Sequence, residues 1–195
     1  LRILFAAVLI LCTLYVYFPS LNMVFINDQL SYFLELDGET SLISGLQLLD
    51  YGAQRRYNKG DEVLYRPLLF LFLSLENSLL KRNFKLWNAV KLVLHISLVY
   101  LLFEMLWRIR PTSFAFGVAM TFGLLMSNFA LVTSNHLGGY LIGYGLLLTA
   151  LWAARAMASV GEDTGSRWFW IYGFTMTSAM LFHEIAVIAS FAIIA

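Results

Sequence analysis

The sequence predicts an all-α protein that crosses a membrane several times. Hydrophobic residues make up 60% of the 195 residues, and Asp, Glu, Lys and Arg make up only 13%. A typical soluble chain carries about 25% charged residues. The apolar residues gather in long runs, and roughly 20 such residues let a helix cross the hydrocarbon of a bilayer. A closed barrel would show short alternating strands instead, so a helical membrane protein is expected.

The charge pattern gives no sign of a nucleic-acid-binding protein. The formal net charge is +1, and no run of basic residues would follow a phosphate backbone. The single cysteine, Cys12, lies in an apolar run and has no partner for an intrachain disulfide. Because the chain begins at Leu1 and ends in an apolar run, we expect residues 1–195 to be one transmembrane module of a longer protein.

The first apolar run, residues 1–18, is expected to be a span that the protein retains. No small-residue cleavage site follows it, which argues against a signal peptide. Tyr15, Tyr17 and Phe18 at its far end suit the aromatic belt of a membrane surface, and Pro19 should end the helix.

A long polar loop, residues 19–80, follows and is expected to lie outside the cytoplasm. The leucine spacing over residues 40–51 predicts an amphipathic helix along the membrane surface. Residues 68–80 are apolar, but Glu76 and Asn77 interrupt them and the run is shorter than a normal span. We expect a re-entrant or short helix there that belongs to the loop. A short tilted span is the alternative.

Four longer apolar runs predict further spans over residues 86–107, 113–132, 137–154 and 168–195. Pro111 marks the first connection between them. Residues 161–167 predict a short polar loop before the last span.

The topology depends on whether residues 68–80 cross the membrane. If they do not, five arginines fall on one side, which the positive-inside rule makes cytoplasmic: Arg2, Arg108, Arg110, Arg155 and Arg167. If they do, the last four move outside, and Lys81, Arg82 and Lys85 move inside. The first arrangement is favoured, since it collects the arginines on one side.

Two charged residues bracket the polar loop. Asp28 follows the first span by about ten residues, where a carboxylate can accept a proton from a hydroxyl nucleophile. Arg66 stands where an apolar run begins, and its planar fork matches phosphate oxygens. The alternatives are a solvated or helix-capping acid for Asp28 and a snorkelling side chain for Arg66.

A polar stripe is predicted on the second long apolar helix. Asn88, Lys91 and His95 fall at i, i+3 and i+7, so they share one face. Ionisable groups in a span are costly and face a protein interior or a wet cavity. The stripe is a candidate lipid-phosphate site. Snorkelling by Lys91 and a packing role for His95 are the alternatives.

Polar residues near the later spans are further candidates. Asn135 and His136 are expected in a turn, and His183 and Glu184 lie within the last predicted span. No spacing typical of metal ligands occurs, so no metal site is predicted, and a requirement for a divalent metal stays open. A Gly-x-x-x-Gly pair at positions 139 and 143 favours close helix packing over a catalytic role.

Taken together, these stretches resemble the GT-C superfamily of membrane glycosyltransferases. The likeness is to protein O-mannosyltransferase-like members, including transmembrane O-mannosyltransferases with tetratricopeptide repeats. Asn27 and Asp28 resemble the family's acidic motif, with Asn27 at the first acid's position. Residues 65–68 match its Tyr-Arg-Pro-Leu motif. The family's His-x-x-Asn-x-x-x-His helix and its later Lys-Glu pair have counterparts here in Asn88, Lys91, His95, His183 and Glu184.

The resemblance implies a GT-C-like helix bundle with a long first extracytoplasmic loop that bears amphipathic helices. It implies that Asp28 is the catalytic base, and that Arg66, Lys91 and His95 lie near the phosphate of a polyprenyl- or dolichyl-phosphate sugar donor. Asn27, Tyr65, Asn88, Asn135 and His136 would then belong to the surrounding site.

The expected function is transfer of a sugar from that donor to a hydroxyl of a protein or glycan acceptor on the extracytoplasmic side. The expected location is the endoplasmic reticulum, another endomembrane or a bacterial inner membrane. The alternatives are a non-catalytic subunit of a membrane complex that keeps the fold, and a transporter.

Overall fold

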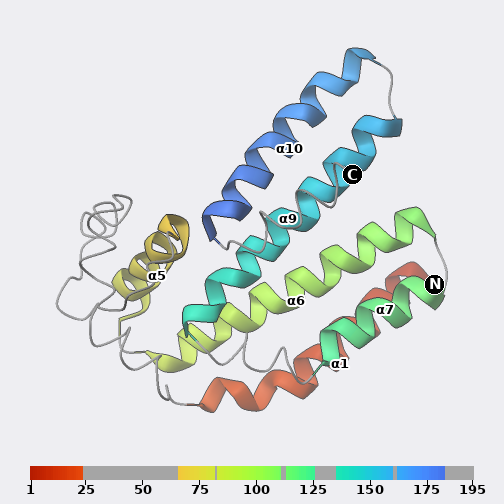
Figure 1. Ribbon diagram of the computed structural model, residues 1–195. Helices are drawn as coiled ribbons and strands as arrows, with labels where there is room; N and C mark the ends of the chain where they lie inside the picture. Colours follow the sequence, from red (N-terminus) through yellow and green to blue (C-terminus); the bar gives the residue numbers. More distant parts are fainter. Residues whose placement is uncertain (24–65, 82, 111–112, 126–134, 160–161, 183–195) are drawn as a thin grey trace.

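The computed structural model describes residues 1–23, 66–81, 83–110, 113–125, 135–159 and 162–182. All of the regular elements in this part of the chain are helical, as the sequence predicts (Figure 1). They are α1 (Arg2–Tyr17), the 3₁₀ helix η1 (Phe18–Asn22), α5 (Pro67–Leu80), α6 (Phe84–Ile109), α7 (Ser113–Leu124), α9 (Asn135–Ser159) and α10 (Glu162–Phe182).

Three of the described helices are long and apolar enough to cross a membrane. They cover Arg2–Asn22, Phe84–Ile109 and Gly139–Ser159. The helices α5 and α7 are apolar but shorter, with 14 and 12 residues. The prediction of a helical membrane protein is thus confirmed by length and composition. Of the predicted span 168–195, residues 168–182 form part of α10, and the rest lie outside the described residues.

Helix boundaries differ from the sequence prediction at four places. The end of the span predicted over 113–132 is wrong, because α7 ends at Leu124 and Leu125 is not helical. The polar loop expected at 161–167 is wrong, because α10 begins at Glu162 and its polar first turns are helical. The turn expected at Asn135 and His136 is wrong as well, since both residues open α9. At Pro19 the α-helix gives way to η1, which begins at Phe18 with the proline in its first turn, a position where a missing N–H costs nothing. The helix predicted over 40–51 lies outside the described residues.

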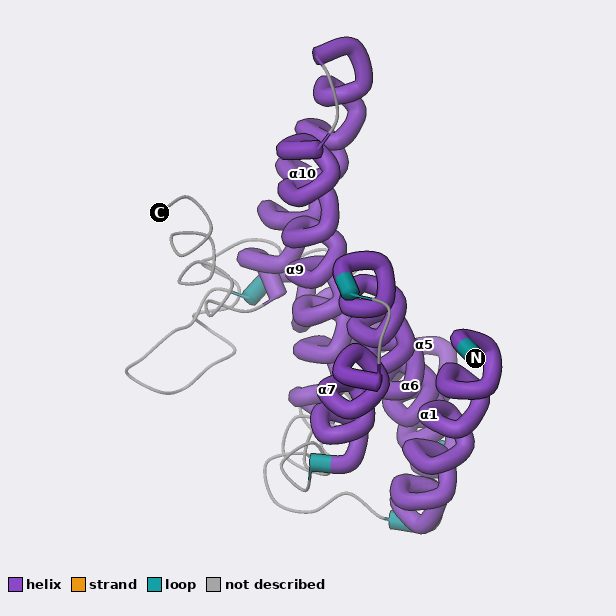
Figure 2. Tube along the Cα trace, turned by 90° about the vertical axis from the view of Figure 1, so that its right-hand side faces the viewer, coloured by secondary structure: helices purple, strands orange, loops and turns teal. Residues whose placement is uncertain are grey.

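The helices α1, α6 and α7 contact one another, and α6 also contacts α9, which packs against α10 and α5 (Figures 1 and 2). Leu9, Val99, Phe103 and Ala119 form the buried core of the first group. Leu69, Leu73, Trp87, Tyr140 and Phe182 form a second core where α5, α6, α9 and α10 meet. The helix α6 is therefore the element that both groups share.

The helices α1 and α6 run in opposite directions. Arg2, at the start of α1, bonds to Glu104 near the end of α6. Ser20 and Met23, just beyond the end of α1, accept hydrogen bonds from Asn88 near the start of α6. Two consecutive spans are antiparallel when the chain between them begins and ends on the same side of the membrane. The packing therefore favours the topology in which α5 does not cross.

Large apolar side chains cover the outside of the bundle, and polar ones lie within it. Ile3, Tyr15, Trp170 and Phe174 are between 73% and 85% exposed. Exposed apolar patches of this kind mark contact with lipid or with a partner. Several polar side chains are at most 7% exposed: Thr13, Ser20, Ser74, Glu76, Asn77, Asn88, Lys91, His95 and Thr175. This distribution fits a protein whose solvent is hydrocarbon.

The glycine pair at 139 and 143 permits close packing of α9, as the sequence predicts. A Cβ on Gly139 would overlap the Leu69 side chain of α5. A Cβ on Gly143 would lie 3.0 Å from the Cβ of Phe182 on α10. Favourable carbon contacts begin at about 3.5 Å, so a side chain at 143 would force the two helices apart.

We expect Gly143→Ala to destabilise the protein by about 1–3 kcal/mol, the usual cost of overpacking. The Phe182 Cβ is attached to the backbone and cannot rotate away. The measurement is the unfolding free energy in detergent micelles.

The matched control is Gly145→Ala, because a Cβ at this position would have no neighbour within 4 Å. Both variants gain the same helix propensity, so their difference isolates the contact. Equal stability of the two would show that α9 and α10 are not closely packed here.

Candidate functional site

The polar stripe predicted on α6 faces the protein interior. Asn88 is 1% exposed, and Lys91 and His95 are fully buried. They lie in the first half of α6, whereas Leu98, Val99 and Phe103 fill the buried face of its second half. The described polar interior is therefore confined to the end of the bundle where α1 ends and α6 begins.

Asn88 binds the chain just beyond the end of the first span. Its Nδ2 donates to the carbonyl oxygens of Ser20 at 3.0 Å and Met23 at 2.9 Å. Its Oδ1 is buried and has no hydrogen-bond partner among the described residues. Because Asp28 comes five residues after Met23, this contact holds the start of the segment that carries the predicted catalytic acid.

His95 holds the end of α7. Its Nε2 lies 3.1 Å from the carbonyl oxygen of Gly123, and its ring packs edge-on against Tyr17 with centroids 4.9 Å apart. The Tyr17 hydroxyl donates to the carbonyl of Leu125 at 2.8 Å. These contacts favour the packing role that the sequence left open for His95 over phosphate binding.

Lys91 lies close enough to Glu76 of α5 for their charges to interact. Glu76 is 4% exposed, and neither of its carboxylate oxygens has a hydrogen-bond partner among the described residues. Sequence reasoning treated Glu76 only as an interruption of an apolar run and missed its relation to Lys91. The sequence did contain a signal for this relation, because each of two apolar helices carries one ionisable residue and buried charges usually occur in pairs.

Arg66 stands at the N-terminal end of α5 and is held by Tyr140 of α9. Its Nη1 donates to the Tyr140 hydroxyl, and its guanidinium carbon lies 5.4 Å from the centre of the Tyr140 ring. Arg66 is partly exposed, whereas Tyr140 is only 7% exposed. Sequence reasoning did not single out Tyr140, because an aromatic residue in an apolar helix is most often part of the core.

Arg66 and the end of the first span lie at the same end of the bundle. Tyr140, which holds Arg66, shares a core cluster with Trp87. Trp87 precedes Asn88, which holds Ser20 and Met23. Asn88 thus binds the exit of the first span directly, and Tyr140 links Arg66 to the core cluster that contains Trp87.

The remaining candidates fall partly or wholly outside the described residues. Asn135 and His136 form the start of α9, but their side chains are not described. Four others lie outside the described part of the chain: Asn27, Asp28, His183 and Glu184. Tyr65 lies outside it as well. The described residues hold no group of three or more His, Cys, Asp or Glu side chains able to bind a metal.

The described part of this site offers a guanidinium at a helix end and two buried ionisable side chains, Glu76 and Lys91. A planar guanidinium suits a phosphate group. Comparisons with protein-family models, with curated proteins and with solved structures found no match.

We expect Lys91→Met to destabilise the protein, because it removes the positive group that lies near the buried Glu76 carboxyl. The double variant Glu76→Gln/Lys91→Met should be less destabilised than the sum of the two single variants, by about 0.5–3 kcal/mol. The measurement is a double-mutant cycle of unfolding free energies in detergent.

Glu76→Gln alone completes the cycle. Additive effects of the two substitutions would show that the two charges do not stabilise one another.

Proposed function

We propose that the chain is a GT-C-like glycosyltransferase. It transfers a sugar from a polyprenyl- or dolichyl-phosphate donor to a hydroxyl acceptor on the extracytoplasmic side of a membrane. The observation that carries the proposal is that Arg66 and the exit of the first span lie at the same end of the bundle. Arg66 binds Tyr140, which belongs to the core cluster of Trp87, and the exit of the first span binds Asn88. A carboxylate and a guanidinium that come from distant parts of the chain can therefore serve one site.

Chain length limits where Asp28 can lie. Five residues separate it from Met23, and each residue of an extended chain advances at most about 3.6 Å. A chain of this length, at most roughly 18 Å, lets Asp28 reach a site at the Arg66 end of the bundle in the proposed enzyme.

In the proposed reaction, Asp28 accepts the proton of the acceptor hydroxyl while that oxygen attacks the anomeric carbon. The bond between the anomeric carbon and the phosphate oxygen breaks, and the lipid phosphate leaves with the bonding electrons. Arg66 stabilises the negative charge that grows on this phosphate. Tyr140 orients the guanidinium by its hydroxyl and ring.

We assign the donor phosphate to Arg66 rather than to Lys91 or His95. Both α6 side chains are fully buried, and His95 contacts the Gly123 carbonyl. Arg66 keeps part of its surface exposed. In this proposal Lys91 and His95 affect the reaction indirectly, through the packing of α5, α6 and α7.

A non-catalytic subunit is the second candidate, and one observation favours it. Asn88 and His95, two positions of the family-like stripe, hold backbone carbonyls at helix ends, a role that needs no substrate. A transporter finds less support in the described residues, because its path needs polar groups across the whole membrane. The second half of α6 buries only apolar side chains.

We expect Asp28→Asn to lower sugar transfer by about 10²–10⁴-fold, the usual contribution of a general base. The fold should be unchanged, because the amide is nearly isosteric with the carboxylate. The measurement is transfer of labelled sugar from a polyprenyl-phosphate donor by the purified full-length protein.

Asp37→Asn, which alters another acid of the same loop, is the matched control and should retain activity. Undiminished transfer by Asp28→Asn would remove this acid from the mechanism. If the unaltered protein transfers no sugar from any polyprenyl-phosphate donor, the non-catalytic candidate is favoured.

We expect Arg66→Lys to lower kcat by at least about tenfold, because an ammonium keeps the charge but loses the planar fork. Arg155→Lys makes the same exchange on α9 near the other end of the bundle and should have no effect. Steady-state kinetics with a labelled donor provide the test. Equal kcat values for the two variants would show that Arg66 serves only as a point charge or a packing group.

A further inference from the structure

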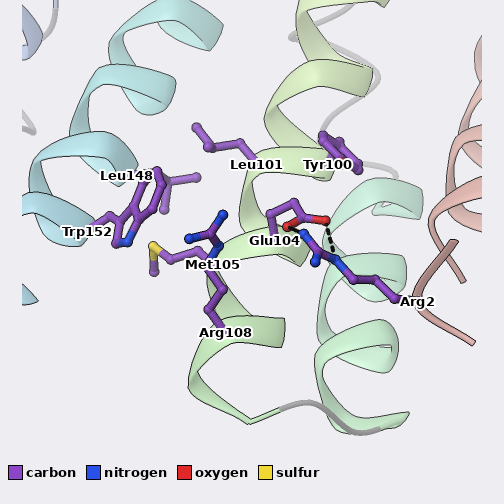
Figure 3. Close-up of a pocket in the computed structure, with 8 residues that line it drawn as sticks. All are labelled: Arg2, Tyr100, Leu101, Glu104, Met105, Arg108, Leu148 and Trp152. Carbon is purple, nitrogen blue, oxygen red and sulfur yellow. Dashed lines mark hydrogen bonds and ion pairs between the residues drawn. The ribbon is translucent and has the colours of Figure 1, made fainter. Parts of the chain in front are cut away.

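We propose that a pocket at the arginine-bearing end of the bundle binds the phosphate group of an anionic membrane lipid. The pocket has a volume of about 290 Å³ and lies between α1, α6 and α9 (Figure 3). It lies at the opposite end of α6 from Asn88, so the two sites can be tested separately. Its lining residues are Arg2, Tyr100, Leu101, Glu104, Met105, Arg108, Leu148 and Trp152.

One face of α6 forms the floor of the pocket. Tyr100, Glu104 and Arg108 are spaced by four residues and therefore lie one above another on the helix. Arg2 reaches this face from α1, and Trp152 reaches it from α9 (Figure 3). A charged group from α1 and an aromatic ring from α9 thus converge on α6.

The pocket carries more positive than negative charge. The Nε of Arg2 donates to Oε1 of Glu104 at 3.0 Å, and the second oxygen of this carboxylate pairs with Nη2 of the same arginine. Arg108 adds a second guanidinium, and Glu104 is the one acid in the lining. The lining therefore has a net charge of +1, which suits an anion.

Arg108 is held in an orientation that suits phosphate. Its guanidinium carbon lies 4.9 Å from the centre of the Trp152 ring. A guanidinium that rests on an aromatic ring still has its N–H donors in its own plane, where a phosphate can meet two of them. In Figure 3 this group lies between Trp152 and Glu104, within the pocket.

The walls indicate a lipid rather than a small soluble anion. Leu101, Met105 and Leu148 give the pocket an apolar side that a free phosphate ion would leave unfilled. A glycerol backbone with the first part of an acyl chain would cover these side chains. Burial of apolar surface would then add to the attraction between charges.

The position of the pocket matches the leaflet where anionic lipids gather. Trp152 contacts Trp168 at 6.0 Å between ring centres, and tryptophans concentrate at membrane interfaces. Arg2 and Arg108 are among the arginines that the favoured topology makes cytoplasmic. The cytoplasmic leaflet carries the negative surface charge of cells, and basic pockets between helices on that side bind anionic headgroups.

The test measures lipid binding by the full-length protein in detergent with native mass spectrometry, titrated with dioleoyl phosphatidic acid or dioleoyl phosphatidylcholine. We expect one phosphatidic acid molecule to bind at a concentration well below that at which phosphatidylcholine binds. Arg108→Gln should weaken that binding about tenfold, the size of one lost charge-assisted contact. Arg155→Gln, which removes an exposed charge outside the pocket, should leave it unchanged.

Leu148→Trp is the second variant, because it fills the pocket without changing any charge and should also weaken binding at the single tight site by at least about tenfold. An equal loss with Arg108→Gln and Arg155→Gln would overturn the proposal in favour of general surface attraction. Unchanged binding by either pocket variant would overturn it too. Displacement of the lipid by about 10 mM inorganic phosphate would show that the pocket selects a soluble anion instead.

Discussion

The structure depends on satisfying the backbone carbonyls at the ends of helices in an apolar environment. The last carbonyls of a helix have no intrahelical partner, and hydrocarbon cannot supply one. Side chains of α1 and α6 meet this requirement. Asn88 donates to Ser20 and Met23 beyond α1, and Tyr17 donates to Leu125 beyond α7. His95 contacts the carbonyl of Gly123 in the last turn of α7. The polar residues that make α6 unusual as a span therefore hold its two neighbours in place.

These contacts with backbone carbonyls favour a structural role for the polar stripe of Asn88, Lys91 and His95. Two of its members, Asn88 and His95, are engaged with the backbone. The third, Lys91, interacts with Glu76 of α5, a charge on a helix that belongs to the segment between the first two long spans. The helix α5 packs against α9, α10 and α6, and it carries Arg66 at its N-terminal end. In the proposed enzyme, α6 thus acts on the site mainly by orienting its neighbours, and the direct contact with donor phosphate falls to a residue held by Tyr140.

The two ends of α6 offer different chemistry. At its start, buried polar groups contact backbone carbonyls and lie near the buried Glu76 of α5. Near its end, an arginine pair and one glutamate line a pocket with apolar walls. The separation follows from the antiparallel packing of α1 on α6, which puts Arg2 beside Glu104 and Met23 beside Asn88. The proposed sugar-transfer site at one surface and the proposed lipid-phosphate site at the other are compatible in a single bundle.

The sequence by itself determined the helical class, the positions of the long apolar helices and the shared face of Asn88, Lys91 and His95. These features depend on composition and on a period of 3.6 residues, which are local properties. The sequence also identified close packing at Gly139 and Gly143, because glycines at this spacing in an apolar helix usually let a neighbouring helix approach closely. Tertiary structure alone decided that Asn88 and His95 meet carbonyls, that Tyr140 holds Arg66, and that Glu76 lies near Lys91. The start of α10 at Glu162 was missed because polar residues suit both a loop and an exposed first turn. The contacts of Asn88, His95, Arg66 and Glu76 all join residues that are distant in the chain. A pattern along one helix carries no information about which helix lies opposite.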